Sequence, residues 1–225
     1  MLSSYNMIKS NTKLLLQEPT KEKKQRLVAD YNDIAKEYDR DFSTDTSDNK
    51  YIDIFLDSLD GLRVLDAGCG CGRDYKYMVQ KGFSVDGIDL SSGMLKIAQE
   101  KIPNGKFELM DMTDLTYPDD KYDGILCNHS FFHIPVKEIP KTLLNFKRVL
   151  KNNGNLLLIL NEGDGETMIE EPYRPETYLY MNYFSMEQIK GLLQKYEFKI
   201  ISATRVKCTD DLSDYKLIIL SNNQK

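Results

Sequence analysis

The stretch Val64-Leu65-Asp66-Ala67-Gly68-Cys69-Gly70-Cys71-Gly72-Arg73-Asp74 decides the fold of this chain. A short run of β-branched and leucine residues leads into three glycines at alternate positions, and a helical pattern over Arg73–Lys81 follows. Glycine permits a tight turn and lets a ligand lie directly on the backbone, facing the start of the helix. Because this loop ends the first strand, the sequence predicts a ligand site at the carboxyl edge of an open α/β sheet.

Strand and helix patterns alternate on either side of this loop. They predict strands over Arg63–Asp66, Ser84–Leu90, Lys106–Met112, Tyr122–Asn128 and Asn155–Leu160, and helices over Gly93–Ile102 and Val136–Lys151. A capping box at Ser185 opens another helix to about Lys195, and the strands Lys199–Lys207 and Tyr215–Ser221 close the chain as a hairpin around an acidic loop with Asp210, Asp211 and Asp214. We therefore predict the α/β class, a doubly wound, mostly parallel seven-stranded sheet with an antiparallel C-terminal hairpin strand.

The N-terminal part of the chain is expected to add helices to this sheet. Apolar residues recur at helical spacing over residues 27–40, and a second short helix is expected over Tyr51–Leu59. Residues 1–26 are mostly polar and are expected to form a flexible or loosely docked arm. The predicted organisation is an arm over 1–26 and a single domain over 27–225, in which residues 27–60 form cap helices.

Length, composition and charge exclude several classes of protein. With 225 residues, 41% of them hydrophobic, the chain is long enough to bury one large core. It has no apolar run of the roughly 18 residues that a membrane span needs and no signal-peptide pattern, so we expect a cytoplasmic protein without a membrane partner. The net charge is −5, and the one short basic run, Lys21–Arg26, is interpreted as a solvated helix face or a floppy tail, so nucleic acid is disfavoured as a partner.

Cysteine and histidine usage argues against a metal centre. Cys69 and Cys71 are separated by a single residue, which matches neither a zinc ribbon nor a thioredoxin motif. The chain has only two histidines, so a metal site would be short of ligands. We therefore expect no metal, and reduced thiols with structural roles.

The spacing of the glycines separates two classes of nucleotide ligand. In the dinucleotide fingerprint G-x-G-x-x-G, the third glycine would fall on Arg73 or on Tyr75, so a nicotinamide oxidoreductase is disfavoured. Asp89 follows at the end of the second predicted strand, where its carboxylate suits the two hydroxyls of a ribose, although a turn there also accommodates an acid. A nucleoside ligand other than a dinucleotide is therefore expected.

The acid two residues before G-x-G-x-G resembles motif I of the class I S-adenosylmethionine-dependent methyltransferases, which have a Rossmann-like fold. The segment Tyr31–Asp39 also resembles the Tyr-x-x-x-Ala-x-x-Tyr-Asp helix of the small-molecule members, and the resemblance covers about Asp30 to Leu220. It implies S-adenosyl-L-methionine as cofactor, S-adenosyl-L-homocysteine as product, and a small-molecule acceptor. The cofactor-binding residues that it implies are Tyr31, Tyr38, Asp66, Ala67, Gly68, Gly70, Gly72, Asp89, Leu90, Met94, Asp111, Met112 and Asn128.

Three acids have distinct roles in this resemblance. Asp66 would face the cationic amino group of the cofactor, Asp89 the ribose, and Asp111 the exocyclic amino group of adenine, with the Met112 amide at a ring nitrogen. An acceptor beside a donor recognises an adenine edge. Tyr31 and Tyr38 lie on one face of the predicted helix, where core packing is the alternative to ligand contact.

The end of the fourth predicted strand is expected beside the transferred methyl group. Cys127–His133 has neither the Asp/Asn-Pro-Pro-aromatic motif of amino-directed nucleic-acid methyltransferases nor the Pro-Cys nucleophile of cytosine-C5 enzymes. Both histidines of the chain lie here, and we assign His133 and His129 as candidate catalytic residues. The alternatives for His133 are a general base, a donor that orients the acceptor, a histidine satisfied by the backbone, and one packed on the cofactor.

The long polar segment over residues 161–184 is expected to form the acceptor lid. Its aromatic residues suit an apolar pocket or a cation–π surface, with a helical cover on the sheet as the alternative, and its acids favour a neutral or cationic acceptor. The leading hypothesis is methyl transfer from S-adenosylmethionine to a small molecule. The alternatives are an RNA or protein methyltransferase and a catalytically silent S-adenosylmethionine-binding protein.

Overall fold

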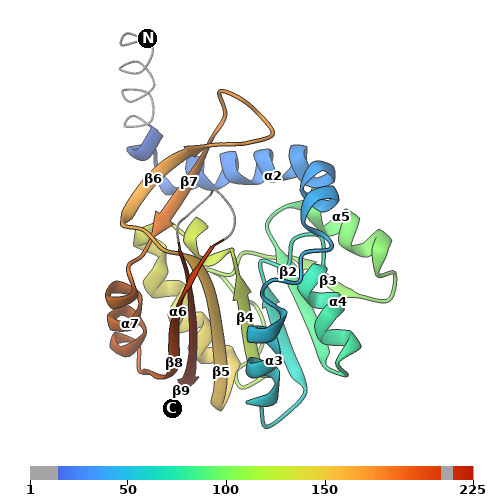
Figure 1. Ribbon diagram of the computed structural model, residues 1–225, viewed down its shortest axis with the longest axis vertical. Coiled ribbons are helices and arrows are strands. Elements are labelled where there is room, and N and C mark those ends of the chain that lie inside the picture. The colour runs from blue at the N-terminus through green and yellow to red at the C-terminus, as the bar shows by residue number, and fades with distance from the viewer. Residues whose placement is uncertain (1–14, 209–214, 225) are drawn as a thin grey trace.

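A computed structural model describes residues 15–208 and 215–224 (Figure 1). Its main sheet has seven strands in the order β3-β2-β1-β4-β5-β9-β8. Only β9 runs antiparallel to its neighbours, β5 and β8. The predicted mostly parallel seven-stranded sheet with an antiparallel C-terminal strand is therefore confirmed. The strands are β1 (Arg63–Ala67), β2 (Ser84–Asp89), β3 (Lys106–Leu109), β4 (Tyr122–Asn128), β5 (Leu150–Asn161), β8 (Phe198–Lys207) and β9 (Tyr215–Asn223).

Helices cover both faces of this sheet. On one face, α3 and α4 pack against apolar residues of β1, β2, β5 and β9. On the other, α6 and α7 pack against the alternate residues of the same central strands, so these strands are buried on both sides, as parallel sheets require. The helices are α2 (Thr20–Phe42), α3 (Asn49–Asp57), α4 (Arg73–Gln80), α5 (Ser92–Lys101), α6 (Ile139–Val149) and α7 (Met186–Lys195), with short 3₁₀ turns η1 (Phe131–His133) and η2 (Val136–Glu138).

Helix α2 begins at Thr20, earlier than the predicted start at residue 27. Its additional turns are docked and not loose, because Lys23 is only 8% exposed and its ammonium lies 4.7 Å from the centre of the Tyr180 ring. The last residues of the predicted arm over 1–26 thus belong to a packed helix. Residues 1–14 of that arm lie outside the described residues.

The segment expected as an irregular lid contains a two-stranded hairpin, β6 (Gly165–Glu170) and β7 (Tyr178–Tyr183). It is therefore not the helical cover that was the alternative. In Figure 1 the hairpin and α2 lie together across the end of the main sheet where the parallel strands finish. These two elements cover the edge at which the glycine loop was expected to bind a ligand.

Other boundaries shift by local causes. The helix predicted over Val136–Lys151 is divided, because Pro140 lies in the first turn of α6 and the chain is already in β5 at Leu150. Strand β3 ends at Leu109, so Asp111 lies in a loop. The acidic turn of the closing hairpin lies outside the described residues. No helix among the described residues is long and apolar enough to cross a membrane.

Candidate functional site

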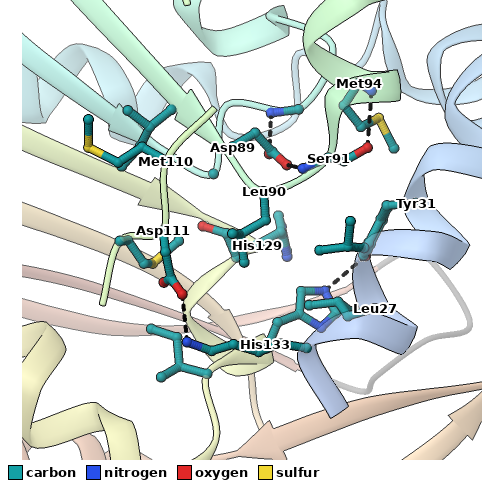
Figure 2. A pocket seen from close by; sticks show the side chains of 18 of the residues that line it. Leu27, Tyr31, Asp89, Leu90, Ser91, Met94, Met110, Asp111, His129 and His133 are labelled. Atoms are coloured by element: carbon teal, nitrogen blue, oxygen red, sulfur yellow. Dashed lines mark hydrogen bonds and ion pairs between the residues drawn. The ribbon is translucent and has the colours of Figure 1, made fainter. Parts of the chain in front are cut away.

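A cavity of about 830 Å³, including its opening to solvent, lies at the carboxyl ends of the strands beneath α2 (Figure 2). The structure brings most of the predicted site residues into its wall: Tyr31, Tyr38, Gly68, Gly70, Asp89, Leu90, Met94, Asp111, Met112, Asn128, His129 and His133. Asp66, Ala67 and Gly72 do not line it.

The glycine loop turns sharply between β1 and α4. Gly68, Gly70 and Gly72 have φ angles of +87°, +51° and +80°, which glycine adopts without strain. A Cβ atom on Gly68 would lie 2.4 Å from the Cβ of Ser130, so this loop also packs directly on the chain after β4. Gly72 instead starts α4 and faces Ile102 and Ala98, which explains its absence from the cavity wall.

Asp89 is held in the cavity wall by backbone donors. The Gly70 amide donates to its Oδ2 at 2.9 Å and the Ser91 amide to its Oδ1 at 2.8 Å. Burial raises the pKa of Asp89, and these backbone hydrogen bonds oppose the rise. Both carboxylate oxygens retain lone pairs, so the geometry suits a ligand that donates two hydroxyl groups.

Two buried acceptor atoms near the glycine loop have no protein partner. Asp66 is 2% exposed, and its Oδ2 is without a hydrogen bond, as is the Oδ1 of Asn128. Burial and the charge of Asp74 raise the pKa of Asp66 well above its usual range. Unpaired buried acceptors are costly, so a donor-rich cationic ligand would fit here.

A second cavity of about 390 Å³ continues the first one along this loop. It shares Tyr38, Gly68, Gly70 and Asn128 with the first and adds Arg73 and Asp74, among other residues. Arg73 and Asp74 form an adjacent ion pair at 2.7 Å, and Asp74 also accepts from Asn128 Nδ2 at 2.9 Å. The two cavities together form an elongated site whose inner end carries both charge signs.

Asp111 has a cationic partner that was not predicted. Its Oδ2 lies 2.6 Å from Lys24 Nζ, and its Oδ1 accepts from the Thr113 amide at 2.8 Å. Burial raises the pKa of Asp111, but the hydrogen bonds from Lys24 and Thr113 outweigh it, so the net pKa is lowered. Lys24 also pairs with Glu138, so the ammonium ties α2 to both the loop after β3 and η2. The carboxylate expected to face adenine is thus engaged by a lysine of the cover.

Helix α2 supplies cavity residues that the sequence analysis missed: Lys24, Leu27 and Val28. With Tyr31 they have the spacing i, i+3, i+4 and i+7, which is one helix face. This spacing is the sequence signal for a helix face that lines a site. The interpretation of the basic run Lys21–Arg26 as solvated does not take it into account. Ile88, Ser91, Met110, Thr113, Ser130 and Ile134 complete the wall.

His133 and Tyr31 form a pair across the cavity, and Figure 2 shows the dashed contact between them. His133 Nε2 lies 2.8 Å from the Tyr31 hydroxyl, and His133 Nδ1 lies 3.1 Å from the Tyr180 carbonyl. Because a carbonyl only accepts, Nδ1 carries the proton and the Tyr31 hydroxyl donates to Nε2. Burial lowers the pKa of His133 to about 4, although the Tyr180 hydrogen bond opposes this shift. The imidazole is therefore neutral near pH 7.

His129 lies on the same wall and has a different partner. Its Nε2 is 3.2 Å from Oδ2 of the buried carboxylate Asp48, which comes from the turn before α3. The two histidines of the chain thus both reach the cavity, one bonded to a phenol and a carbonyl, the other to an acid.

The hairpin β6–β7 contributes less than predicted. The aromatic and methionine residues expected to form an acceptor pocket do not line the cavity: Tyr173, Tyr178, Tyr180, Met181, Tyr183 and Phe184. Several of the acids there are engaged elsewhere, as in the contacts of Glu162 with Arg205 and of Glu166 with Tyr180. These residues therefore lie outside the main cavity, the role of this segment as an acceptor pocket stays a prediction, and the hairpin contacts the site through the Tyr180 carbonyl.

The cysteines near the site are unpaired. Cys69, Cys71 and Cys127 are buried free thiols, and Cys127 Sγ lies 3.0 Å from Ser130 Oγ. Burial raises the pKa of Cys127 to about 12, so it is a thiol and not a nucleophilic thiolate. Within the described residues, no group of three or more histidine, cysteine, aspartate or glutamate side chains is arranged to hold a metal ion.

The chain is similar in sequence to methyltransferases. A family described as "Methyltransferase domain" matches residues 64–154. An uncharacterized methyltransferase of Alkaliphilus oremlandii is 31% identical over 170 residues, which are 66% of this chain and 73% of that protein. Phosphoethanolamine N-methyltransferase 1 of Zea mays is 40% identical over 103 residues, 44% of this chain. The chain spans only 20% of the length of the maize protein.

Solved structures share the fold over nearly the whole chain. The 1,6-didemethyltoxoflavin-N1-methyltransferase of Burkholderia thailandensis, solved with 1,6-didemethyltoxoflavin and S-adenosylhomocysteine bound, superposes with a TM-score of 0.76. The match covers 92% of each chain at 19% sequence identity. An S-adenosylmethionine-dependent methyltransferase of Methanosarcina mazei gives a TM-score of 0.69 at 20% identity over 77% of this chain and 96% of the other.

Proposed function

This chain belongs to the family of class I S-adenosylmethionine-dependent methyltransferases, and from that premise we propose that it methylates a small molecule by in-line displacement. The observation that carries the proposal is the elongated cavity along the glycine loop, with acceptor atoms at one end and the two histidines on its wall. It has an opening to solvent and a cover formed by α2, as a site for two small ligands requires.

The residues present fit S-adenosylmethionine. The unpartnered oxygen of Asn128, which lines both cavities, matches the donors of a cationic amino acid group, and the backbone-held carboxylate of Asp89 matches a ribose. Asp66 lines neither cavity, so its unpartnered oxygen would reach that group through a water. Asp111 and the Met112 amide would hold the adenine edge, beside the contact that Lys24 already makes with Asp111. When bound, the cofactor supplies a methyl group already activated by its sulfonium charge, with a neutral thioether as leaving group.

The chain's own residues then have to orient the acceptor and exclude water. Leu27, Val28 and Ile134 give the wall an apolar lining on the side of α2. Tyr31 and His133 lie beside it as a hydrogen-bonded pair that can orient an acceptor by donating or accepting at the phenol. No metal, nucleophile or covalent intermediate is needed for this chemistry.

The acceptor that these contacts favour is small and uncharged. The one lysine or arginine lining the main cavity, among the described residues, is Lys24, which is already paired with Asp111 and Glu138. A phosphate such as the one named in the maize relative would find no unpaired cation on this wall. An uncharged heterocycle of the kind named in the Burkholderia protein is compatible with the apolar lining.

We place the reaction in the cytoplasm. The support is that Cys69, Cys71 and Cys127 are buried free thiols, which a reducing compartment maintains. Nucleic acid stays disfavoured as a partner, because Lys23 and Lys24 of the basic run are engaged within the protein.

Calorimetric titration tests the donor. We expect micromolar binding of S-adenosylmethionine and no binding of NADH. Binding of NADH alone would mean that the glycine loop serves a dinucleotide. S-adenosylhomocysteine formation is then measured over a broad panel of small acceptors. Binding without transfer to any acceptor in that panel would favour the catalytically silent protein.

A further inference from the structure

His129 is held in an unusual backbone conformation by contacts outside the cavity. Its φ angle is +51°, in the left-handed region that non-glycine residues seldom adopt. Its amide donates to the Ile159 carbonyl of β5 at 2.9 Å, which ties this residue to the sheet. Strained residues of this kind cluster at functional sites, so the position of the ring needs an explanation.

Asp48 supplies that explanation at the other side of the ring. It is 6% exposed, and its two oxygens lie 3.2 Å from His129 Nε2 and 3.5 Å from the Nζ of Lys216 on β9. Burial alone would raise the pKa of Asp48, but the hydrogen bond from His129 and the charges of Lys216 and Arg73 are among the effects that outweigh it and lower the pKa to about 2. An ionised carboxylate only accepts, so His129 Nε2 carries the proton of the neutral imidazole.

The two histidines therefore offer different nitrogens to a ligand. Both nitrogens of His133 already have protein partners, Tyr31 and the Tyr180 carbonyl. Among residues 15–208 and 215–224, His129 has a hydrogen-bond partner at Nε2 only. Within these residues, Nδ1 of His129 is therefore the imidazole nitrogen on this wall that is left to a ligand.

They also differ in the groups that surround their rings. Burial lowers the pKa of His133 to about 4, and the partners of its ring nitrogens within the described part of the chain are Tyr31 and the Tyr180 carbonyl. A positive charge on His129 would instead lie against the ionised Asp48, whose other oxygen is paired with Lys216. The charged groups near His129 are thus Asp48 before α3, Lys216 on β9 and Arg73 on α4. The other titratable group there is the neutral His133 in η1.

We propose that Asp48 is a positioning residue that holds His129 with Nδ1 toward the ligand, and that His129 accepts a proton from the methyl acceptor. The acceptor class follows, namely an uncharged small molecule that reacts through a hydroxyl or an acidic N–H group. This inference rests on the proposed function. The acceptor oxygen or nitrogen gains the methyl group and loses its proton to His129 Nδ1, while the electron pair of the broken carbon–sulfur bond leaves with sulfur.

Histidine-selective ¹⁵N labelling tests the positioning role directly, because the chain has only two histidines. In the wild-type protein we expect His129 as the Nε2–H form and His133 as the Nδ1–H form. His129→Asn assigns the signals and keeps the backbone, since asparagine tolerates a positive φ. Asp48→Asn preserves the shape of the side chain but removes its charge, so we expect a mixture of both His129 tautomers. Asp57→Asn is the matched control, because Asp57 is exposed on α3 and removes the same charge elsewhere.

Methyl transfer to a panel of acceptors tests the proton transfer. The panel contains phenol and 1,2,4-triazole, which must lose a proton on methylation, and pyridine, which has none to lose. We expect Asp48→Asn and His129→Asn to slow transfer to the proton-bearing acceptors by about 10- to 10³-fold. Transfer to pyridine should fall much less in the same two variants, a split that a merely structural defect would not give, and Asp57→Asn should leave every rate within about twofold of wild type.

Two results would overturn the proposal. One is a His129 tautomer that is Nδ1–H in the wild type or unchanged in Asp48→Asn. The other is methylation restricted to acceptors without a transferable proton. Failure of the wild-type protein to bind S-adenosylmethionine would overturn the proposed function instead, and the tautomer comparison would still decide the role of Asp48.

Discussion

The two sides of the cavity are held together in different ways. The glycine-loop side rests on backbone groups, as in the bonds from the Gly68 and Cys69 amides to the Ile88 carbonyl at 2.8 and 2.9 Å. The cover, formed by α2 and the hairpin β6–β7, rests on side chains of distant segments, through ion pairs such as Lys24 with Asp111 and apolar contacts such as Ala35 with Met94.

This difference predicts different mechanical behaviour. Backbone bonds within the sheet edge are retained whatever the side chains do, so the glycine-loop side is a fixed template for the cofactor. Side-chain ion pairs are individually weak and are screened by salt, so the cover is the side that can open. Variants on each side should therefore fail in different measurements.

Gly68→Ala should have the largest effect, because it damages the template. The new Cβ would lie 2.4 Å from Ser130 Cβ, and the φ of +87° is strained for alanine. We expect the free energy of unfolding to fall by about 2–5 kcal/mol from strain and overpacking together. Denaturant titration measures this. Gly191→Ala is the control, because its Cβ meets open space within α7, and it should stabilise the protein by roughly 0.5–1 kcal/mol. Equal free energies of unfolding for Gly68→Ala and Gly191→Ala would contradict the conclusion that the glycine loop is a fixed template.

His133→Asn should change how stability depends on pH, because His133 joins the template to the cover. The pKa of His133 is about 4 in the folded protein, against 6.5 for an unperturbed histidine, so the unfolded chain binds more protons between these values. The wild type should therefore lose about 2–3 kcal/mol of stability from this group between pH 7 and pH 4.5.

The variant should lack that contribution, so its stability should fall less over the same interval. Denaturant titrations at both pH values give the two differences. Identical pH dependence of the two proteins would show that His133 is not buried as a neutral imidazole.

Asp89→Asn should weaken cofactor binding without opening the cover. The amide keeps the shape of the side chain but loses the charge that receives the ribose, so we expect a loss of about 1.5–3 kcal/mol in binding free energy. Calorimetry with S-adenosylhomocysteine measures the affinity. Asp86→Asn is the control on the same strand, since Asp86 binds Tyr122 and Lys121 and does not line the cavity. Unchanged affinity in Asp89→Asn would refute the ribose assignment.

Lys24→Met should have the smallest effect and the opposite sign. If adenine and Lys24 compete for Asp111, removing the ammonium strengthens cofactor binding. The expected gain in binding free energy is that of a partly exposed ion pair, about 0.2–1 kcal/mol. At high salt the affinity of the variant for the cofactor should approach that of the wild type, because salt already weakens the ion pair in the wild type. Lys21→Met, exposed on the same helix, should not change affinity. Weaker binding in Lys24→Met would mean that Lys24 holds the cofactor instead of competing with it.

Sequence reasoning worked best where the determinants are local. The alternation of strands and helices, the glycine loop and the acid at the end of β2 are each defined within a few residues, and the structure brings Gly68, Gly70 and Asp89 into one wall. It worked less well for the hairpin β6–β7. Tyr178–Tyr183 carries apolar residues on both faces, and Pro172 and Pro175 in the connection mask the pairing of its strands.

The chain by itself determined the doubly wound sheet and the edge at which a ligand binds, because strand order and the glycine turn follow from short-range patterning. Only the tertiary structure decided which side chains meet there. Tyr31 reaches His133, Lys24 reaches Asp111, and Asp48 reaches His129 across 102, 87 and 81 positions of sequence. No local pattern encodes such pairs, since each depends on how α2 and the turn before α3 dock on the finished sheet. The sequence therefore predicts the glycine loop and its edge of the sheet, whereas the side-chain pairs of the acceptor side form only on folding.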